Sequence, residues 1–220
     1  TLWHTESLYQ DVHRRVAALL SKYCGAQEIE DTLHKYDIQN LPFYGYGIKS
    51  FILSMIEAAI EISAGRVTGP EIQQIIGMTR DMLVSEVRLL DGVREVVSGL
   101  AGRYPMMVVT KGDLFDQATK LERSGLRPFV EHVEVVSTKT NESYTELFAK
   151  YRIPPSRFLM VGNSIKSDIL PVLELGGKAV YIPYEITWVH EEADPPAEGG
   201  DSYFKIDKLA ELPELLERME

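Results

Sequence analysis

The sequence has 220 residues, 45% hydrophobic and 25% charged, which is typical of a globular protein that buries a sizeable core. Its net charge of -10 argues against a nucleic-acid-binding surface or an anionic membrane surface, so an anionic substrate would need a local cluster or a bound cation. The longest apolar run is too short to span a bilayer, and the single cysteine, Cys24, excludes an internal disulfide and fits a cytoplasmic protein.

The first 90 residues or so are predicted to be helical. Apolar residues recur at three- and four-residue steps between residues 5 and 23, and further helices are expected at 29–36, 47–64 and 70–87. No convincing strand comes before residue 100. This part of the chain is therefore expected to form an all-helical bundle of about four helices.

The pattern changes after Leu90 to short apolar runs that alternate with helical segments. Strands are predicted at 105–109, 133–137, 158–161, 179–182 and 204–206, and helices at 93–100, 115–124, 144–151, 169–175 and 209–219. Residues 184–202, including His190, are expected to form a long surface loop. Alternation of strands and helices predicts an α/β fold with a parallel, right-handedly wound sheet.

The stretch from Phe158 to Ile169 is the first candidate for a functional site. An apolar strand is broken by Gly162, and the loop that follows carries Asn163, Ser164, Ser167 and Asp168 before the next helix. Ligands of open parallel sheets bind at the carboxyl ends of the strands, which is where this loop lies. The alternative is that Ser167 or Asp168 only caps the following helix.

Two other predicted strands end in matching chemistry. Thr110 and Lys139 would lie just past strand carboxyl ends and would face the same crevice as Asn163 and Asp168. Thr110 and nearby backbone N–H groups could bind an anion, and Lys139 could neutralise a transferring group. Asp168 and Asn163 offer the hard oxygen ligands that suit Mg²⁺. The alternatives are a helix cap for Thr110, a solvated loop lysine for Lys139 and a turn residue for Asn163.

The order Val-Val-Thr110-Lys-Gly, then Lys139, then Val161-Gly-Asn-Ser-Ile-Lys-Ser-Asp168 resembles the second, third and fourth motifs of the haloacid dehalogenase (HAD) superfamily. Thr1-Leu2 resembles the end of that family's first motif, Asp-x-Asp-x-Thr-Leu. The resemblance implies a Rossmann-like parallel-sheet core, residues 1–8 and 88–220, with an inserted all-helical cap of residues 9–87 that closes over the crevice.

The resemblance also implies the reaction. It is Mg²⁺-assisted hydrolysis of a small phosphorylated metabolite through an aspartyl-phosphate intermediate, with Thr110, Lys111 and Gly112 at the phosphate, Lys139 offsetting charge, and Asp168 with Asn163 holding the cation. The nucleophilic and acid/base aspartates would precede Thr1, on an upstream segment of roughly ten residues that also supplies a central strand.

Two features leave alternatives open. Asn163 stands where the family more often has an aspartate, which removes a charge from the cation site and favours weaker metal binding unless the upstream carboxylate compensates. In the cap, Tyr44, Tyr46 and Lys49 are candidates for reading the non-phosphate end of the substrate, with packing inside the cap as the alternative. Carbon–halogen hydrolysis without metal and a non-catalytic binding module are the rival functions.

Overall fold

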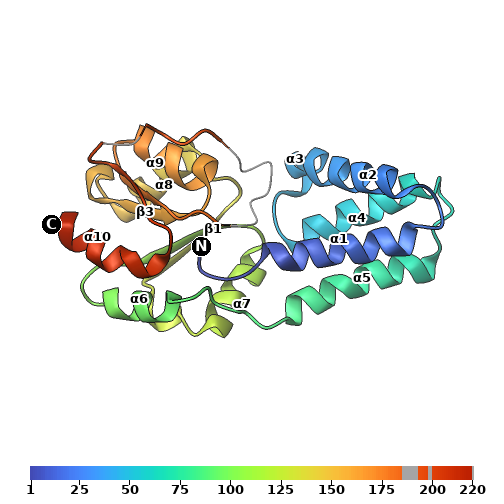
Figure 1. Ribbon diagram of the computed structural model, residues 1–220, viewed down its shortest axis with the longest axis horizontal. Helices are drawn as coiled ribbons and strands as arrows, with labels where there is room; N and C mark the ends of the chain where they lie inside the picture. The colour runs from blue at the N-terminus through green and yellow to red at the C-terminus, as the bar shows by residue number, and fades with distance from the viewer. Residues whose placement is uncertain (185–192, 198–199, 220) are drawn as a thin grey trace. The chain divides into compact units, whose positions relative to one another are not determined.

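A computed structural model of the protein describes residues 1–184, 193–197 and 200–219 (Figure 1). Contacts within the chain divide it into two compact units. The α/β unit comprises Thr1–His4, Arg88–Thr110 and Leu121–Glu220, and the helical unit comprises Thr5–Val87 and Lys111–Lys120. The helical unit thus takes in residues 5–8 and 111–120 besides the expected cap of residues 9–87. Much of the expected 184–202 loop, including His190, lies outside the described residues.

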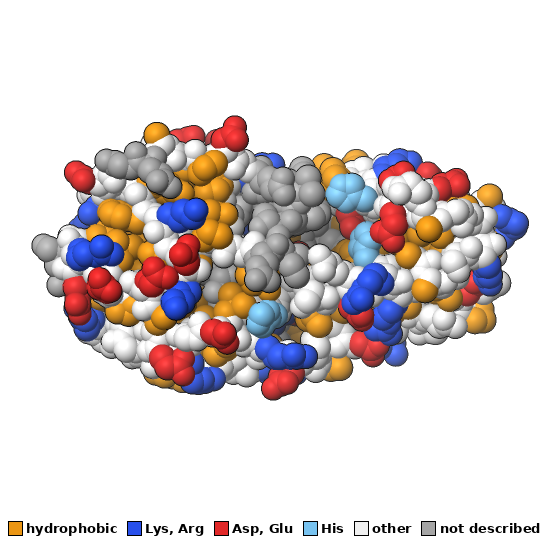
Figure 2. Space-filling model, in the orientation of Figure 1, with side chains coloured by type: hydrophobic (Ala, Val, Ile, Leu, Met, Phe, Trp, Pro, Cys, Tyr) orange, Lys and Arg blue, Asp and Glu red, His pale blue; other side chains and the backbone are white. Residues whose placement is uncertain are grey.

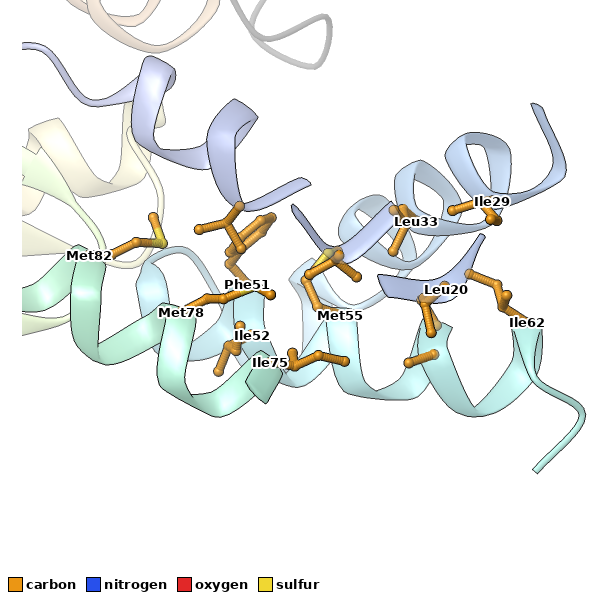
Figure 3. Close-up of a cluster of buried hydrophobic side chains, with 14 of the residues drawn as sticks. Leu20, Ile29, Leu33, Phe51, Ile52, Met55, Ile62, Ile75, Met78 and Met82 are labelled. Atoms are coloured by element: carbon orange, nitrogen blue, oxygen red, sulfur yellow. The ribbon is translucent and has the colours of Figure 1, made fainter. Parts of the chain in front are cut away.

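The helical unit is built on four longer helices whose apolar faces meet in one core. They are α1 (Glu6–Leu20), α2 (Ala26–Gln39), α4 (Ile48–Ile62) and α5 (Gly69–Val84). Figure 3 shows Leu33 of α2, Met55 of α4 and Ile75 of α5 among the side chains that fill this core. Each such buried aliphatic side chain stabilises the bundle by about 1.5–3 kcal/mol. The predicted helical bundle is therefore observed, with helix ends shifted by a few residues.

Two local features of the helical unit differ from the prediction. Helix α2 runs over Ala26–Gln39, whereas residues 29–36 were expected, because its polar ends carry no apolar period although they are helical. A further short helix, α3 (Leu41–Tyr44), was not predicted. Four residues with proline in the first turn are too few to show a helical period.

The α/β unit contains the strands. Its elements in chain order are α6 (Val93–Leu100), β1 (Met107–Lys111), α7 (Leu114–Ser124), η1 (Arg127–Phe129), β2 (His132–Val136), α8 (Asn141–Tyr151), η2 (Pro155–Arg157), β3 (Leu159–Gly162), η3 (Ile165–Ile169), α9 (Leu170–Glu174), β4 (Lys178–Tyr181), β5 (Tyr203–Lys205), η5 (Leu209–Glu211) and α10 (Leu212–Met219). The last residue of β1 and the first turns of α7 belong to the helical unit. Strands β3, β4 and β5 are parallel neighbours, with Met160 opposite Ala179 and Val180 opposite Phe204. Strands β1 and β2 pair separately. The α/β architecture is as predicted, but the described strands form two sheets.

Both sheets lie in one layer between helices. In β1, Val108 packs with the cluster that includes α6 and α10, whereas Val109 packs with the cluster that includes α8. In β3, Val161 packs with the first of these clusters and Met160 with the second. Side chains alternate across a strand, so β1 and β3 place their faces against the same two helical layers. In Figure 1, α8 and α9 lie on one side of β3 and α10 on the other.

A large cavity separates β1 from β3 within the α/β unit. Its volume is about 1050 Å³, and it is lined by Met106–Thr110 and Phe158–Val161 together with apolar side chains of α6 and α10. Among the described residues, β1 has only β2 as a strand neighbour and β3 has only β4. The cavity therefore lies in the plane of the sheet, between two strands that could each accept another.

Positive and negative side chains are interspersed on the described part of the face shown in Figure 2. The absence of a nucleic-acid-binding surface stays a prediction from the net charge of -10. In the described ranges, the structure contains no helix with the length and apolar character needed to cross a membrane.

Candidate functional site

The loop after β3 folds back so that Asp168 packs against the end of its own strand. Asp168 Oδ2 accepts a hydrogen bond from the Ser164 backbone N at 3.0 Å, and the Ser164 side chain accepts one from the Ser167 backbone N at 3.0 Å. The following turn, η3, is a π-helix. Ser164 is thus the residue whose side chain caps this turn. Asp168 instead accepts from the Ser164 backbone N, which precedes the turn, so the alternative in which Asp168 only caps the helix is wrong.

Asp168 forms a buried ion pair with Lys139. Lys139 Nζ lies 2.6 Å from Asp168 Oδ1, and the two side chains are 11% and 4% exposed. A charged pair this well buried is held by mutual attraction and hydrogen bonds, since either charge alone would be costly in the interior. The alternative of a solvated loop lysine is therefore wrong for Lys139.

Asn163 binds the first residue of the described chain. Its Oδ1 accepts hydrogen bonds from Thr1 Oγ1 at 2.7 Å and from the Thr1 N at 2.9 Å. The contact spans 162 positions in sequence and fixes the side-chain oxygen of Asn163 next to Asp168's loop. Asn163 thus makes a tertiary contact, which a residue that only forms a turn would not need.

Thr110 belongs to strand β1 itself. The strand was expected at 105–109 but covers Met107–Lys111, because the β-branched Val-Val-Thr run continues the extended backbone. Thr110, Lys139, Asn163 and Asp168 all line the cavity between β1 and β3. The structure therefore brings the four residues to one cavity, with an alcohol, an ammonium, an amide and a carboxylate.

The other candidates lie in the helical unit. Lys111 and Gly112 directly follow Thr110, and Lys111 Nζ lies 4.1 Å from the centroid of the Tyr46 ring. The Lys49 ammonium pairs with Asp113 at 3.0 Å. The hydroxyl of Tyr44 donates a hydrogen bond to Glu57. Each of these side chains is therefore engaged within the helical unit.

A family model for haloacid dehalogenase-like hydrolases matches residues 1–176. The chain belongs to this family. It is similar to a haloacid dehalogenase-like family hydrolase from Xanthomonas campestris, with 35% identity and a TM-score of 0.87 over 100% of this chain and 87% of that one.

Two further HAD proteins are more distant. The HAD-hydrolase YfnB of Bacillus subtilis is 26% identical over 135 residues, and the match covers 59% of this chain and 54% of YfnB. The 2-haloacid dehalogenase of Pseudomonas syringae shares the fold, with 18% identity and a TM-score of 0.65 over 100% of this chain and 95% of that one. Membership of the haloacid dehalogenase-like hydrolase family is thus shown, whereas these relatives do not determine which bond this chain cleaves.

The donor set of this HAD chain fits part of a magnesium site. Asp168 and Asn163 supply two side-chain oxygens at the end of β3, and Mg²⁺ commonly takes one or two carboxylates and completes its shell with water and substrate oxygens. Within the described ranges, no group of three or more His, Cys, Asp and Glu side chains is arranged to hold a metal ion. Asp168 and Asn163 are therefore compatible with a cation but form only part of its site.

Sequence reasoning missed how two residues support the site. Gly162 was expected only to break the strand, but a Cβ there would lie 2.4 Å from the Cβ of Asp168, so only glycine permits this fold of the loop. Tyr144 is the other: its buried hydroxyl donates to the Ser167 carbonyl at 3.2 Å, and burial, aided by the charge of Asp168, raises the pKa of this phenol. The helical period places Tyr144 in the core but gives no sign of this contact.

Proposed function

We propose that this HAD hydrolase is a Mg²⁺-dependent phosphomonoester hydrolase that acts on a small phosphorylated metabolite. The observation that carries the proposal is the buried Lys139–Asp168 pair, at 2.6 Å, in the cavity that Thr110 and Asn163 also line. Phosphoryl transfer is stabilised by a positively charged side chain, by hydroxyl or amide hydrogen-bond donors, and by a metal ion held by oxygen ligands. These four residues supply those groups.

Thr110, Lys111, Gly112 and Lys139 form the phosphate side of the proposal. Thr110 would donate its hydroxyl to a phosphoryl oxygen, and the backbone N–H groups of Lys111 and Gly112 follow it directly in sequence. Gly112 has φ of 122°, a conformation open to glycine, so its backbone can approach an anion without a side chain in the way. Lys139 would offset negative charge in the transition state while it remains paired with Asp168.

Asp168 and Asn163 would hold the cation. When bound, Mg²⁺ would polarise the phosphoryl oxygens and neutralise part of their charge. Because Asn163 supplies an amide oxygen in place of a carboxylate, the site carries one negative charge less. We expect this to weaken Mg²⁺ binding unless a carboxylate outside the described residues contributes.

The proposal also needs a nucleophilic aspartate and an acid/base aspartate in the cavity between β1 and β3, beside the four residues named above. Thr1, which resembles the end of the family's first motif, lines this cavity together with Asn163. The nucleophile would form a bond to phosphorus as the ester P–O bond breaks, the acid would protonate the leaving alcohol, and water would then release phosphate.

Tyr44, Tyr46 and Lys49 stay predictions for the part that reads the non-phosphate end of the substrate. The contacts described above for these three side chains are to protein groups of the helical unit, which supports a packing role at least as well. A substrate-reading role requires the effect of a substitution to depend on the leaving group.

The deciding experiment uses the full-length protein. Hydrolysis of p-nitrophenyl phosphate that EDTA abolishes and Mg²⁺ restores supports the proposal, and chloride release from a 2-haloacid without metal overturns it in favour of the dehalogenase. Absence of both activities favours the non-catalytic binding module.

A matched pair of variants assigns any activity to this site. Asp168→Asn should reduce hydrolysis at least about a hundredfold, because it removes the carboxylate that binds Lys139 and the proposed cation. Asp207→Asn is the control, since Asp207 is exposed in the same unit, and it should leave the rate unchanged.

A further inference from the structure

Residues 46–49 of the helical unit pack against residues 111–113, which directly follow Thr110 in the chain. Lys49 Nζ lies 3.0 Å from Asp113 Oδ2, and Lys111 Nζ lies 4.1 Å from the centroid of the Tyr46 ring. Both segments belong to the helical unit. The side chains of Asp113 and Lys111, in the segment that follows Thr110, are thus contacted by two side chains from a segment more than 60 positions away.

The contact also involves the backbones of both segments. A Cβ on Gly47 would lie 2.9 Å from the Asp113 N and 3.4 Å from the Gly112 Cα, so the two chains approach as closely as glycine allows. Gly47 has φ of 118° and Gly112 has φ of 122°, values that side-chain-bearing residues rarely adopt. Gly45 also has a positive φ, of 71°, but nothing lies within 4 Å of its Cβ position.

Asp113 connects this contact to helix α7. Its Oδ2 binds Lys49, and its Oδ1 accepts a hydrogen bond from the Asp116 backbone N at 3.1 Å in the first turn of α7. The Asp113 backbone carbonyl also accepts from the Gln117 N at 2.9 Å. The hydrogen bond from Lys49 lowers the pKa of Asp113, which keeps the carboxylate charged for both contacts. Lys49 therefore binds the residue that directly precedes α7 and accepts hydrogen bonds from its first turn.

We infer that Tyr46, Gly47 and Lys49 form a clasp that fixes the backbone of residues 111–113 and thereby positions Thr110 and the amides beside it for phosphate. The inference rests on the proposed function for its effect on activity. It makes Lys49 a positioning residue that acts through Asp113, whereas a substrate-reading Lys49 would contact the leaving group. The two roles predict different effects of a Lys49 substitution on the affinity for a ligand that has no leaving group.

Inorganic phosphate is that ligand, measured as a competitive inhibitor of p-nitrophenyl phosphate hydrolysis by the full chain. Lys49→Met should lower kcat/KM and raise the Ki of inorganic phosphate by similar factors of about two- to fivefold, as expected for a partly exposed ion pair. Lys49→Arg should restore most of both. An unchanged Ki for phosphate beside a lowered kcat/KM would assign Lys49 to the leaving group and overturn the clasp.

The control for Lys49→Met is Lys35→Met. Lys35 pairs with Glu61 at 2.9 Å in the same unit, with side chains 54% and 46% exposed, so the substitution removes a comparable ion pair away from residues 111–113. Its kinetics should match the wild type. Gly47→Ala should change kcat/KM and the Ki of phosphate more than Lys49→Met does, because its added Cβ meets the backbone of residues 112 and 113. Gly45→Ala introduces similar backbone strain without that contact, so both constants should stay within about twofold of the wild type.

Hydrogen–deuterium exchange tests the clasp without any activity. Lys49→Met and Gly47→Ala should speed exchange of the Asp116 and Gln117 amides relative to the wild type, and Lys35→Met should not. Unchanged exchange in both clasp variants would overturn the inference. If the wild type hydrolyses no phosphoester, the proposed function fails, and the exchange result still decides the clasp.

Discussion

Replacing Gly162 with alanine should disrupt the site by displacing Asp168. The added Cβ would lie 2.4 Å from the Asp168 Cβ and Cγ and 2.3 Å from its Oδ2, whereas carbon atoms in contact are separated by about 3.5–4.0 Å. The whole Asp168 side chain must therefore move by about 1 Å. Its hydrogen bonds to Lys139 at 2.6 Å and to the Ser164 N at 3.0 Å cannot both survive that shift.

The size of the effect follows from these contacts. Overpacking a rigid interior costs about 1–3 kcal/mol, and complete loss of a buried ion pair would raise the cost to about 3–5 kcal/mol. For a chain of this length each kcal/mol lowers the thermal midpoint by roughly 2–4 °C. A cost of about 3 kcal/mol, where the two ranges meet, should therefore lower the Tm of Gly162→Ala by roughly 6–12 °C. Phosphatase activity should fall at least about tenfold because the groups around Asp168 lose their positions.

The assay is thermal unfolding followed by circular dichroism, with Gly99→Ala as the matched control. Gly99 lies inside helix α6, and nothing lies within 4 Å of its Cβ position. Alanine there should stabilise the helix by about 0.5–1 kcal/mol. A Tm for Gly162→Ala equal to or above that of the wild type, with normal activity, would refute the packing argument.

Three further predictions concern charge and metal. The hydrogen bond from Lys22 lowers the pKa of Glu71 from 4.5 to about 2, so the stabilisation by this carboxylate is complete above about pH 4.5 and is lost as the pH falls toward 2. Glu71→Gln should therefore lower Tm at pH 7 and much less at pH 2.5. Lys139→Met should destabilise the protein by about 3–5 kcal/mol in denaturant unfolding, since it leaves Asp168 buried without its partner, and a loss below 1 kcal/mol would contradict this. Saturating Mg²⁺ should raise the Tm of the full chain but not that of Asp168→Asn, and equal shifts would exclude Asp168 as a ligand.

The helices and most strand positions could be predicted from the sequence because their signals are local. The apolar period of α1 and α4 and the short apolar run of β3 each arise within one segment, where backbone geometry relates residues a few positions apart. The same local pattern indicated Asn163 and Asp168, since they follow a buried strand at its carboxyl end. Ser164 lies in the same loop, but the sequence did not indicate that its side chain caps the following turn, which only the structure shows.

Contacts between distant segments could not be predicted in this way. The pairing of Lys139 with Asp168, the fit of Gly162 against Asp168, and the packing of Gly47 on Asp113 depend on where the chain returns in space. The separation of β1 from β3 also could not be predicted, because the packing of the whole unit determines which strands become neighbours. The sequence by itself determined the elements and the chemical groups at their ends. The tertiary structure decided which groups meet, since burial and close packing act between residues that no local pattern relates.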